Sequence, residues 1–186
     1  MRLHHISLGL LLTVGLTSSC EKIDFGDESG VTEKTIANVP NGHVDESDWK
    51  LDDKWNDKEK DLFKDLPVGI DGTKSRLVTN QQFGFYPNPV KQFSTFGYSF
   101  DLASQVSVGT QIRFVIVNRK YKVMQEGNIA SRNTPWNPQT GLSGFSVSFT
   151  DDKYKKGETY RMYYVLYEPE QLAFLGKGHG DIEIAD

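Results

Sequence analysis

The chain has 186 residues, a length that suits one domain with terminal extensions. Its 21 Lys and Arg residues stand against 25 Asp and Glu residues, and a formal net charge of −4 argues against a nucleic-acid-binding protein, which would need a basic surface. Cys20 is the one cysteine, so the rest of the chain has no thiol for a disulfide, a metal site or a nucleophile.

Residues 1–19 have the pattern of a signal peptide. After a basic start, the apolar run from Ile6 to Leu16 has about 11 residues, too short to span a bilayer. Two serines then precede Cys20. This ending resembles the lipobox of bacterial lipoproteins, with Thr17 where Leu is usual, and the loosened box is similar to those of Bacteroidetes-type lipoproteins. An ordinary secretory signal with a chance cysteine is the alternative.

The lipobox resemblance implies that Cys20 carries a thioether-linked diacyl lipid and becomes the first residue of the mature protein. Several acyl chains hold a protein on a bilayer far better than one, so the expected partner is a membrane reached through the lipid anchor. Position 21 is Glu, and not the Asp usually linked to inner-membrane retention. The acidic run 21–28 is similar to signals for surface export. We therefore expect an outer-membrane protein exposed on the cell surface, with the periplasmic face as the alternative.

Residues 20–47 are predicted to be a flexible acidic tether. They are polar and lack periodicity, and Gly26, Gly30, Pro40 and Gly42 interrupt any regular element. Such a composition buries too little apolar surface to offset the entropy of ordering the chain. A tether of this length would separate the folded part from the membrane.

Residues 48–75 are expected to form a short helix and a loop that pack on the folded domain. Asn56 with Glu59 three residues later has the form of a capping box, which predicts a helix over 57–65 that stops before the next proline. The segment also holds two tryptophans that we expect to pack on the domain, with an exposed contact for a partner as the alternative: Trp49 and Trp55.

Residues 76–186 are predicted to form an all-β domain. Apolar and polar residues alternate in short runs that turn residues separate, and no long helical pattern lies between the runs. About seven strands bury one face each most simply as two antiparallel sheets, so we expect an immunoglobulin-like antiparallel β-sandwich, with a small barrel as the runner-up. The run 111–117 is apolar on both faces and is expected to be central. The outward aromatic side chains of a later strand are either exposed or covered by the helix: Tyr163 and Tyr167.

The run Tyr86-Pro87-Asn88-Pro89-Val90 resembles the opening of the immunoglobulin-like sorting domains at the C-terminus of type IX secretion cargo. In those domains a Gly-x-x-Tyr piece precedes a late strand, as Gly157 and Tyr160 do here. The likeness implies the fold and not the sorting function, because the chain already has a lipid-export signal. The two prolines fix φ and remove donors, so they end one strand and start the next at a defined angle.

Four side chains are the candidates for a reaction centre. His179 and Asp181 lie in a glycine-rich run, where an acid–base loop competes with a flexible hairpin or bulge before the last strand, and we expect the hairpin or bulge. Asp151 and Asp152 follow a predicted strand, and a solvated turn is their expected role. The sequence therefore predicts no catalytic, cofactor or metal residue. A hydrolase whose carboxylates converge only in the fold is one alternative.

The stretch 131–141 is the strongest candidate for binding. It is polar and carries Trp136 between two prolines. Prolines reduce the entropy lost on binding, and an exposed tryptophan offers a flat apolar face that stacks on sugar rings or partner side chains. Arg132 and Asn137 are predicted to bind with it, unless the tryptophan folds back on the end of the sandwich. We expect a non-catalytic binding or interaction module for a glycan or protein, with a structural subunit or adaptor of an envelope assembly as the alternative.

Overall fold

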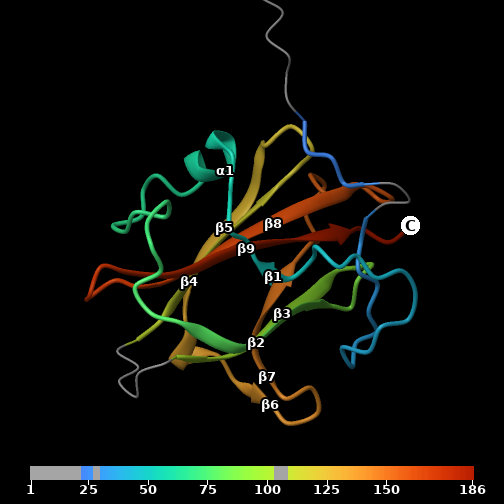
Figure 1. Cartoon of the computed structure of the whole chain (residues 1–186). Helices are drawn as coiled ribbons and strands as arrows, with labels where there is room; N and C mark the ends of the chain where they lie inside the picture. Colours follow the sequence, from blue (N-terminus) through green and yellow to red (C-terminus); the bar gives the residue numbers. More distant parts are fainter. Residues whose placement is uncertain (1–21, 27–29, 103–108) are drawn as a thin grey trace, which may run out of the picture.

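The computed structural model describes residues 22–26, 30–102 and 109–186, so the predicted signal peptide and Cys20 lie outside the described residues. Two antiparallel sheets pack face to face (Figure 1), with strand orders β1-β9-β8-β4-β5 and β2-β3-β7-β6. The described elements are β1 (Lys50–Leu51), α1 (Asp57–Asp61), β2 (Val78–Tyr86), β3 (Phe93–Leu102), β4 (Gln111–Val117), β5 (Val123–Ala130), η2 (Ser131–Asn133), β6 (Trp136–Asn137), β7 (Leu142–Ser148), β8 (Thr159–Glu168) and β9 (Ala173–Glu183).

The strand order is that of an immunoglobulin-like sandwich, as the alternation in the sequence predicted. Strands β2, β3, β7 and β6 take the places of strands A, B, E and D. Strands β9, β8, β4 and β5 take the places of G, F, C and C′ in the facing sheet. The short strand β1 extends the second sheet beyond β9.

The interior between the sheets is filled by aromatic and branched side chains. Phe96 of β3 lies at its centre, with ring centroids 5.4 Å from Phe145 and 5.1 Å from Tyr164. Strand β4 is central, between β5 and β8, and five of its seven residues are buried, as its two apolar faces predicted. The predicted period-two pattern therefore identifies the core correctly.

Tyr160 fixes the corner where the chain enters β8. Its hydroxyl accepts the backbone N–H of Lys155 at 3.0 Å and donates to the carbonyl of Lys153 at 3.4 Å. A tyrosine near the start of strand F that bonds back to the preceding loop is a recurrent feature of immunoglobulin-like sandwiches. Gly157, with φ of 69°, makes the turn that brings this loop back to the tyrosine.

The glycine-rich run near the C-terminus is not a hairpin, because residues 176–181 lie within strand β9, but the register with β8 shifts at Leu175, directly before the run, as a bulge would. Its glycines alternate with Lys177, His179 and Asp181, so they share one face of the strand. A Cβ on Gly180 would overlap the Trp49 ring, and one on Gly178 would overlap the Lys50 carbonyl. The space that the missing glycine side chains leave is thus occupied by Trp49 and by the backbone of Lys50, at the start of β1.

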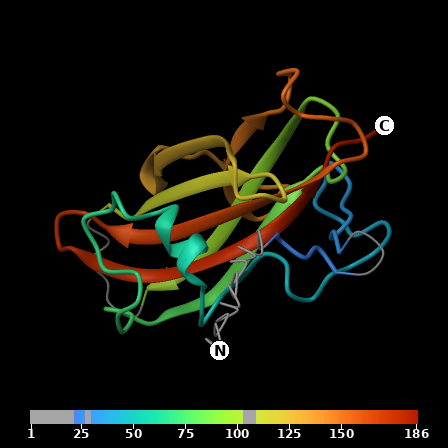
Figure 2. The same cartoon turned by 90° about the horizontal axis from the view of Figure 1, so that it is seen from above.

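The predicted flexible tether is wrong for the described part of residues 20–47. Ile23, Phe25 and Val31 are buried, and the backbone of Lys34 bonds to that of Asn88 in both directions, at 2.7 and 2.9 Å. Figure 2 shows this N-terminal stretch, in blue, running along the sandwich. The described residues before β1 are therefore part of the folded domain.

A second apolar cluster lies on the outer face of the five-stranded sheet. Tyr163 of β8 is fully buried there under Trp55, whose ring centroid is 5.3 Å away. The capping box at Asn56 and Glu59 is present as predicted, but α1 ends at Asp61 and is shorter than the expected 57–65. The segment after it continues as turns that bring Phe63 onto Trp55. Of the two alternatives for the outward tyrosines, the structure shows them covered, by this apolar cluster.

Candidate functional site

Trp136 lies on the surface and is not folded back on the sandwich. It occupies the two-residue strand β6, paired with Ser143 of β7, and its side chain is 60% exposed. Two backbone bonds hold this position: Gly141 donates to the carbonyl of Asn137 at 2.9 Å, and Gly144 donates to that of Pro135 at 3.3 Å. A large apolar ring therefore stands in water on a backbone that is well fixed.

A groove of about 340 Å³ opens between the edges of the two sheets, and Pro135, the residue before this tryptophan, lines it. Strand β5 contributes Asn128 to it, and the connection from β5 to β6 contributes Asn133 and Thr134. The hydroxyl of Thr134 donates to the carbonyl of Ser131 at 2.7 Å and contacts the Tyr98 hydroxyl, which fixes this wall. Amide and hydroxyl groups thus line a hollow beside an exposed aromatic face.

The structure places the two other predicted binding residues in this region, in different roles. Arg132 lies in η2 and is exposed. Asn137 follows Trp136, but its Oδ1 accepts the backbone N–H of Gln139 at 2.9 Å, so this oxygen supports the turn. Asn128 and Ser146 of the groove come from β5 and β7, which lie on either side of residues 131–141 in the chain and belong to different sheets.

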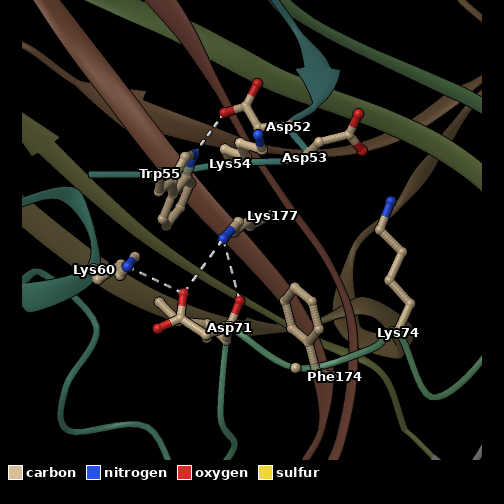
Figure 3. Close-up of a pocket in the computed structure, with 11 residues that line it drawn as sticks. Asp52, Asp53, Lys54, Trp55, Lys60, Asp71, Lys74, Phe174 and Lys177 are labelled. Atoms are coloured by element: carbon tan, nitrogen blue, oxygen red, sulfur yellow. Dashed lines mark hydrogen bonds and ion pairs between the residues drawn. The ribbon is translucent and has the colours of Figure 1, made fainter. Parts of the chain in front are cut away.

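A second hollow, of about 350 Å³, lies on the outer face of the five-stranded sheet, between β9, α1 and the loop at 70–74 (Figure 3). Lys177 of β9 is buried at its base, over the Trp55 ring at 5.3 Å, and donates to the carbonyl of Ile70 at 3.2 Å. Burial lowers the pKa of Lys177. Asp71 lies 4.0 Å from its Nζ and 3.5 Å from that of Lys60, so a carboxylate of the chain itself already faces both ammonium groups.

A buried polar cluster attaches the N-terminal stretch to β9. Asp181 accepts two bonds of 2.6 Å from Arg161, and its own backbone N–H donates to Asp48 at 2.8 Å. Asp48 also accepts the N–H of Thr32 at 2.9 Å. His179 Nδ1 lies 2.8 Å from Asp52 Oδ2. The bonds of Asp48 and Asp52 join β9 to the N-terminal stretch, and the Arg161 pair joins β9 to β8, so we assign the cluster a structural role.

The four candidates for a reaction centre are not gathered around one cleft. His179 and Asp181 share the outward face of β9 and have the partners just described. Asp151 lies in the β7–β8 loop, where it pairs with Lys153 at 2.9 Å, and Asp152 beside it is exposed. None of the four lines the groove beside Trp136 or the hollow of Figure 3. In the described part of the chain, no three His, Cys, Asp or Glu side chains come together as metal ligands.

The buried cluster predicts that the protein is less stable at alkaline than at acidic pH. Burial, together with the nearby charge of Asp181, raises the pKa of Asp48 from 3.8 to about 7. The folded state then holds a proton that the unfolded state has lost, so stability falls as the pH rises from about 4 to about 7. For His179, burial lowers the pKa, but the bond to Asp52 and the charges of Asp52 and Asp181 together raise it more. The net rise adds a loss of stability in the same direction as the pH rises through this pKa.

We expect the free energy of unfolding to be on the order of 3 kcal/mol lower at pH 8 than at pH 5. Urea unfolding at both pH values measures this difference. In Asp48→Asn, which cannot titrate at this position, most of the difference should disappear. Equal stability of the unmodified protein at pH 5 and pH 8 would show that Asp48 is ionised across this range.

Comparisons of the chain with protein-family models, with curated proteins and with solved structures found no match. Within the described ranges, no helix is long and apolar enough to cross a membrane. The class that the fold itself defines is an immunoglobulin-like β-sandwich with an exposed tryptophan at the rim of a groove of mixed polar and apolar lining.

Proposed function

We propose that this protein is a lipid-anchored protein of the outer membrane that binds glycans without catalysing a reaction on them. The observation that carries the binding role is Trp136, exposed on a fixed two-residue strand beside a groove. A flat aromatic side chain stacks on the apolar face of a sugar ring, while amide and hydroxyl groups exchange hydrogen bonds with its hydroxyls. The groove supplies such groups from Asn133 and Ser146, whereas Thr134 and the amide nitrogen of Asn128 already bond to other parts of the domain.

The anchor part of the proposal rests on the sequence. The signal pattern of residues 1–19 ends at Cys20, and the lipobox resemblance makes this cysteine the lipidated N-terminus. The described residues then begin at Lys22, on the sandwich itself. Capture of polysaccharide at the cell surface is a role that suits an exported, membrane-attached protein with an exposed tryptophan at its binding site.

Trp136→Ala is expected to weaken glycan binding at least tenfold, because truncation of a central aromatic contact costs about 2 kcal/mol or more. The probe is the oligosaccharide that the unmodified protein binds best on a glycan array, and calorimetric titration measures the affinity. Phe93→Ala is the matched control: Phe93 is an aromatic residue with similar exposure, 56%, at the far end of the same sheet, where it pairs with Ser148. Equal loss in both variants, or no glycan bound by the unmodified protein, would contradict the proposal.

The uncovered part of β7 favours a second candidate, an adaptor that binds a partner strand. Strand β6 covers only Leu142 and Ser143, and the described residues leave the outer edge of β7 without a paired strand beyond them. Because Gly144 donates outward to Pro135, the backbone of Ser146, two residues on, faces the same open side. An extended segment could add to this edge by β-augmentation. Self-association of the mature chain in light scattering, with no glycan bound, would favour this candidate.

A further inference from the structure

The chain is fixed to the sandwich only three residues after the lipid-attachment cysteine. Ile23 is buried, and its backbone N–H donates to the carbonyl of Arg119 at 2.9 Å, in the turn between β4 and β5. Phe25 is buried beneath two guanidinium groups, those of Arg119 at 5.1 Å and Arg161 at 5.3 Å from its ring centroid. These contacts attach the N-terminal stretch to one particular corner of the domain.

The spacing from Cys20 to Ile23 limits how far this corner can be from the bilayer. Each residue of an extended chain spans at most about 3.6 Å, so three residues reach about 11 Å. This distance is similar to the thickness of the headgroup region on one side of a bilayer, roughly 5–8 Å. A lipidated Cys20 therefore leaves no room for a long spacer between the membrane surface and the β4–β5 turn.

The same turn is basic. Lys22, Arg119, Lys120 and Lys122 are exposed, and none of the four makes an ion pair within the part of the chain that the structure describes. Lys58 adds a fifth positive charge, with its Nζ 5.6 Å from the centroid of the Tyr121 ring. Four acidic residues adjoin these positive charges in sequence or through contacts: Glu21, which precedes Lys22, Asp24, Asp57, which pairs with Lys60 at 3.2 Å, and Glu59, which accepts from Tyr163. The five basic side chains still outnumber the acidic ones at this corner, on a chain whose net charge is −4.

We propose that the β4–β5 turn, residues 118–122, rests on the anionic headgroups of the bilayer that holds the Cys20 anchor. This inference rests on the proposed lipid anchor. Basic side chains close to a membrane surface are attracted to its negative phosphate-bearing lipids. The anchor fixes which corner meets the bilayer, and the lysines then hold that corner down, so the domain has one orientation on the surface.

This orientation directs the glycan groove away from the membrane. Strand β5 begins at Val123, directly after the turn, and runs eight residues to Ala130, which leads into the walls of the groove. At about 3.3 Å per residue the strand spans roughly 25 Å. In Figure 1 the β4–β5 turn and the first described residues lie at the top, and β6 lies at the bottom.

Fluorescence quenching by the membrane tests this orientation in the acylated, full-length mature protein. A cysteine is introduced at Val123 or, as a control on the β6–β7 turn, at Gln139, and each is labelled with the dye NBD after Cys20 has been acylated. The proteins are reconstituted in vesicles of phosphatidylcholine and phosphatidylglycerol, 7:3, that contain a headgroup spin-labelled lipid. We expect quenching at position 123 to exceed that at position 139 at least fivefold. Equal quenching at both positions would overturn the proposal.

Two further variants separate the contributions of the anchor spacing and the charges. The double variant Lys120→Gln/Lys122→Gln should at least halve the quenching at position 123, whereas the matched double variant Lys64→Gln/Lys74→Gln should leave it unchanged. An insertion of 15 Gly and Ser residues after Lys22 would move the anchor away and should also lower it. Unchanged quenching in the Lys120/Lys122 variant and with the insertion would contradict the proposal. If Cys20 is not acylated, the proteins will not enter the vesicles, and this outcome refutes the anchor itself rather than the orientation.

Discussion

Trp49→Ala is expected to lower the free energy of unfolding by about 3–5 kcal/mol, the cost typical of removing a buried tryptophan. The Trp49 ring lies inside the sandwich, stacked on Phe85 at a centroid distance of 5.4 Å, and it fills the space that the missing side chain of Gly180 leaves. On the same face of β9, Gly178 on one side of Gly180 has no side chain to fill this space, and Ile182 on the other side is already buried in the core. Truncation therefore leaves a cavity and loosens the attachment of β1 to β9.

Chemical denaturation at pH 6 measures this loss, and Trp136→Ala is the control. Trp136 is 60% exposed, so the same truncation should change the free energy of unfolding by no more than about 0.5 kcal/mol. A loss below about 1 kcal/mol for Trp49→Ala would show that the chain before β1 is not part of the core. If the variant does not fold at all, Trp49→Phe, which keeps an aromatic ring in the site, should recover a folded protein of intermediate stability.

Arg161→Met is expected to cost about 3–5 kcal/mol, because it leaves the buried carboxylate of Asp181 without its partner. The Asp181 side chain is 1% exposed, and burial raises its pKa even with the guanidinium present. Arg161 also donates to the carbonyl of Asp24 at 3.2 Å, so its loss loosens the N-terminal stretch as well. Methionine keeps most of the side-chain volume of arginine. The loss of stability therefore comes mainly from the lost ion pair and hydrogen bonds.

The chain offers a matched control in Arg113, on the neighbouring strand β4. Its side chain is 15% exposed, close to the 14% of Arg161, but its partners Glu126 and Asp65 are 53% and 62% exposed. Exposed carboxylates regain water when the arginine is removed, so Arg113→Met should cost at most about 1 kcal/mol. Urea unfolding of both variants measures the contrast. Equal losses would mean that the Asp181 pair contributes no more than a surface pair.

The sequence predicts the sandwich because its strands follow a simple rule. In β8, Tyr160, Met162 and Tyr164 alternate with residues of the other face, and all three enter the interior. The capping box at Asn56 is equally local, and it forms as expected. Both signals depend on residues close together in the chain, which is why they can be recognised without the fold.

The N-terminal stretch and β9 could not be predicted in the same way. Ile23, Phe25 and Val31 are single apolar residues in a polar stretch, and they pack as an extended chain with no period of its own. In β9 the glycines take the positions where inward apolar residues are expected, because Trp49 fills the interior from another segment. In both cases the packing partner is remote in sequence. The groove beside Trp136 has the same origin, since Asn128 and Ser146 meet only when the two sheets pack.

Acylation of Cys20 is the claim on which both the proposed function and the orientation on the membrane depend. Metabolic labelling of the native host with an alkyne fatty acid, followed by capture of the protein, tests it most directly. We predict a strong label on the unmodified protein and none on Cys20→Ala expressed to the same level. An unlabelled protein, or an equal label on the Cys20→Ala variant, would contradict the account.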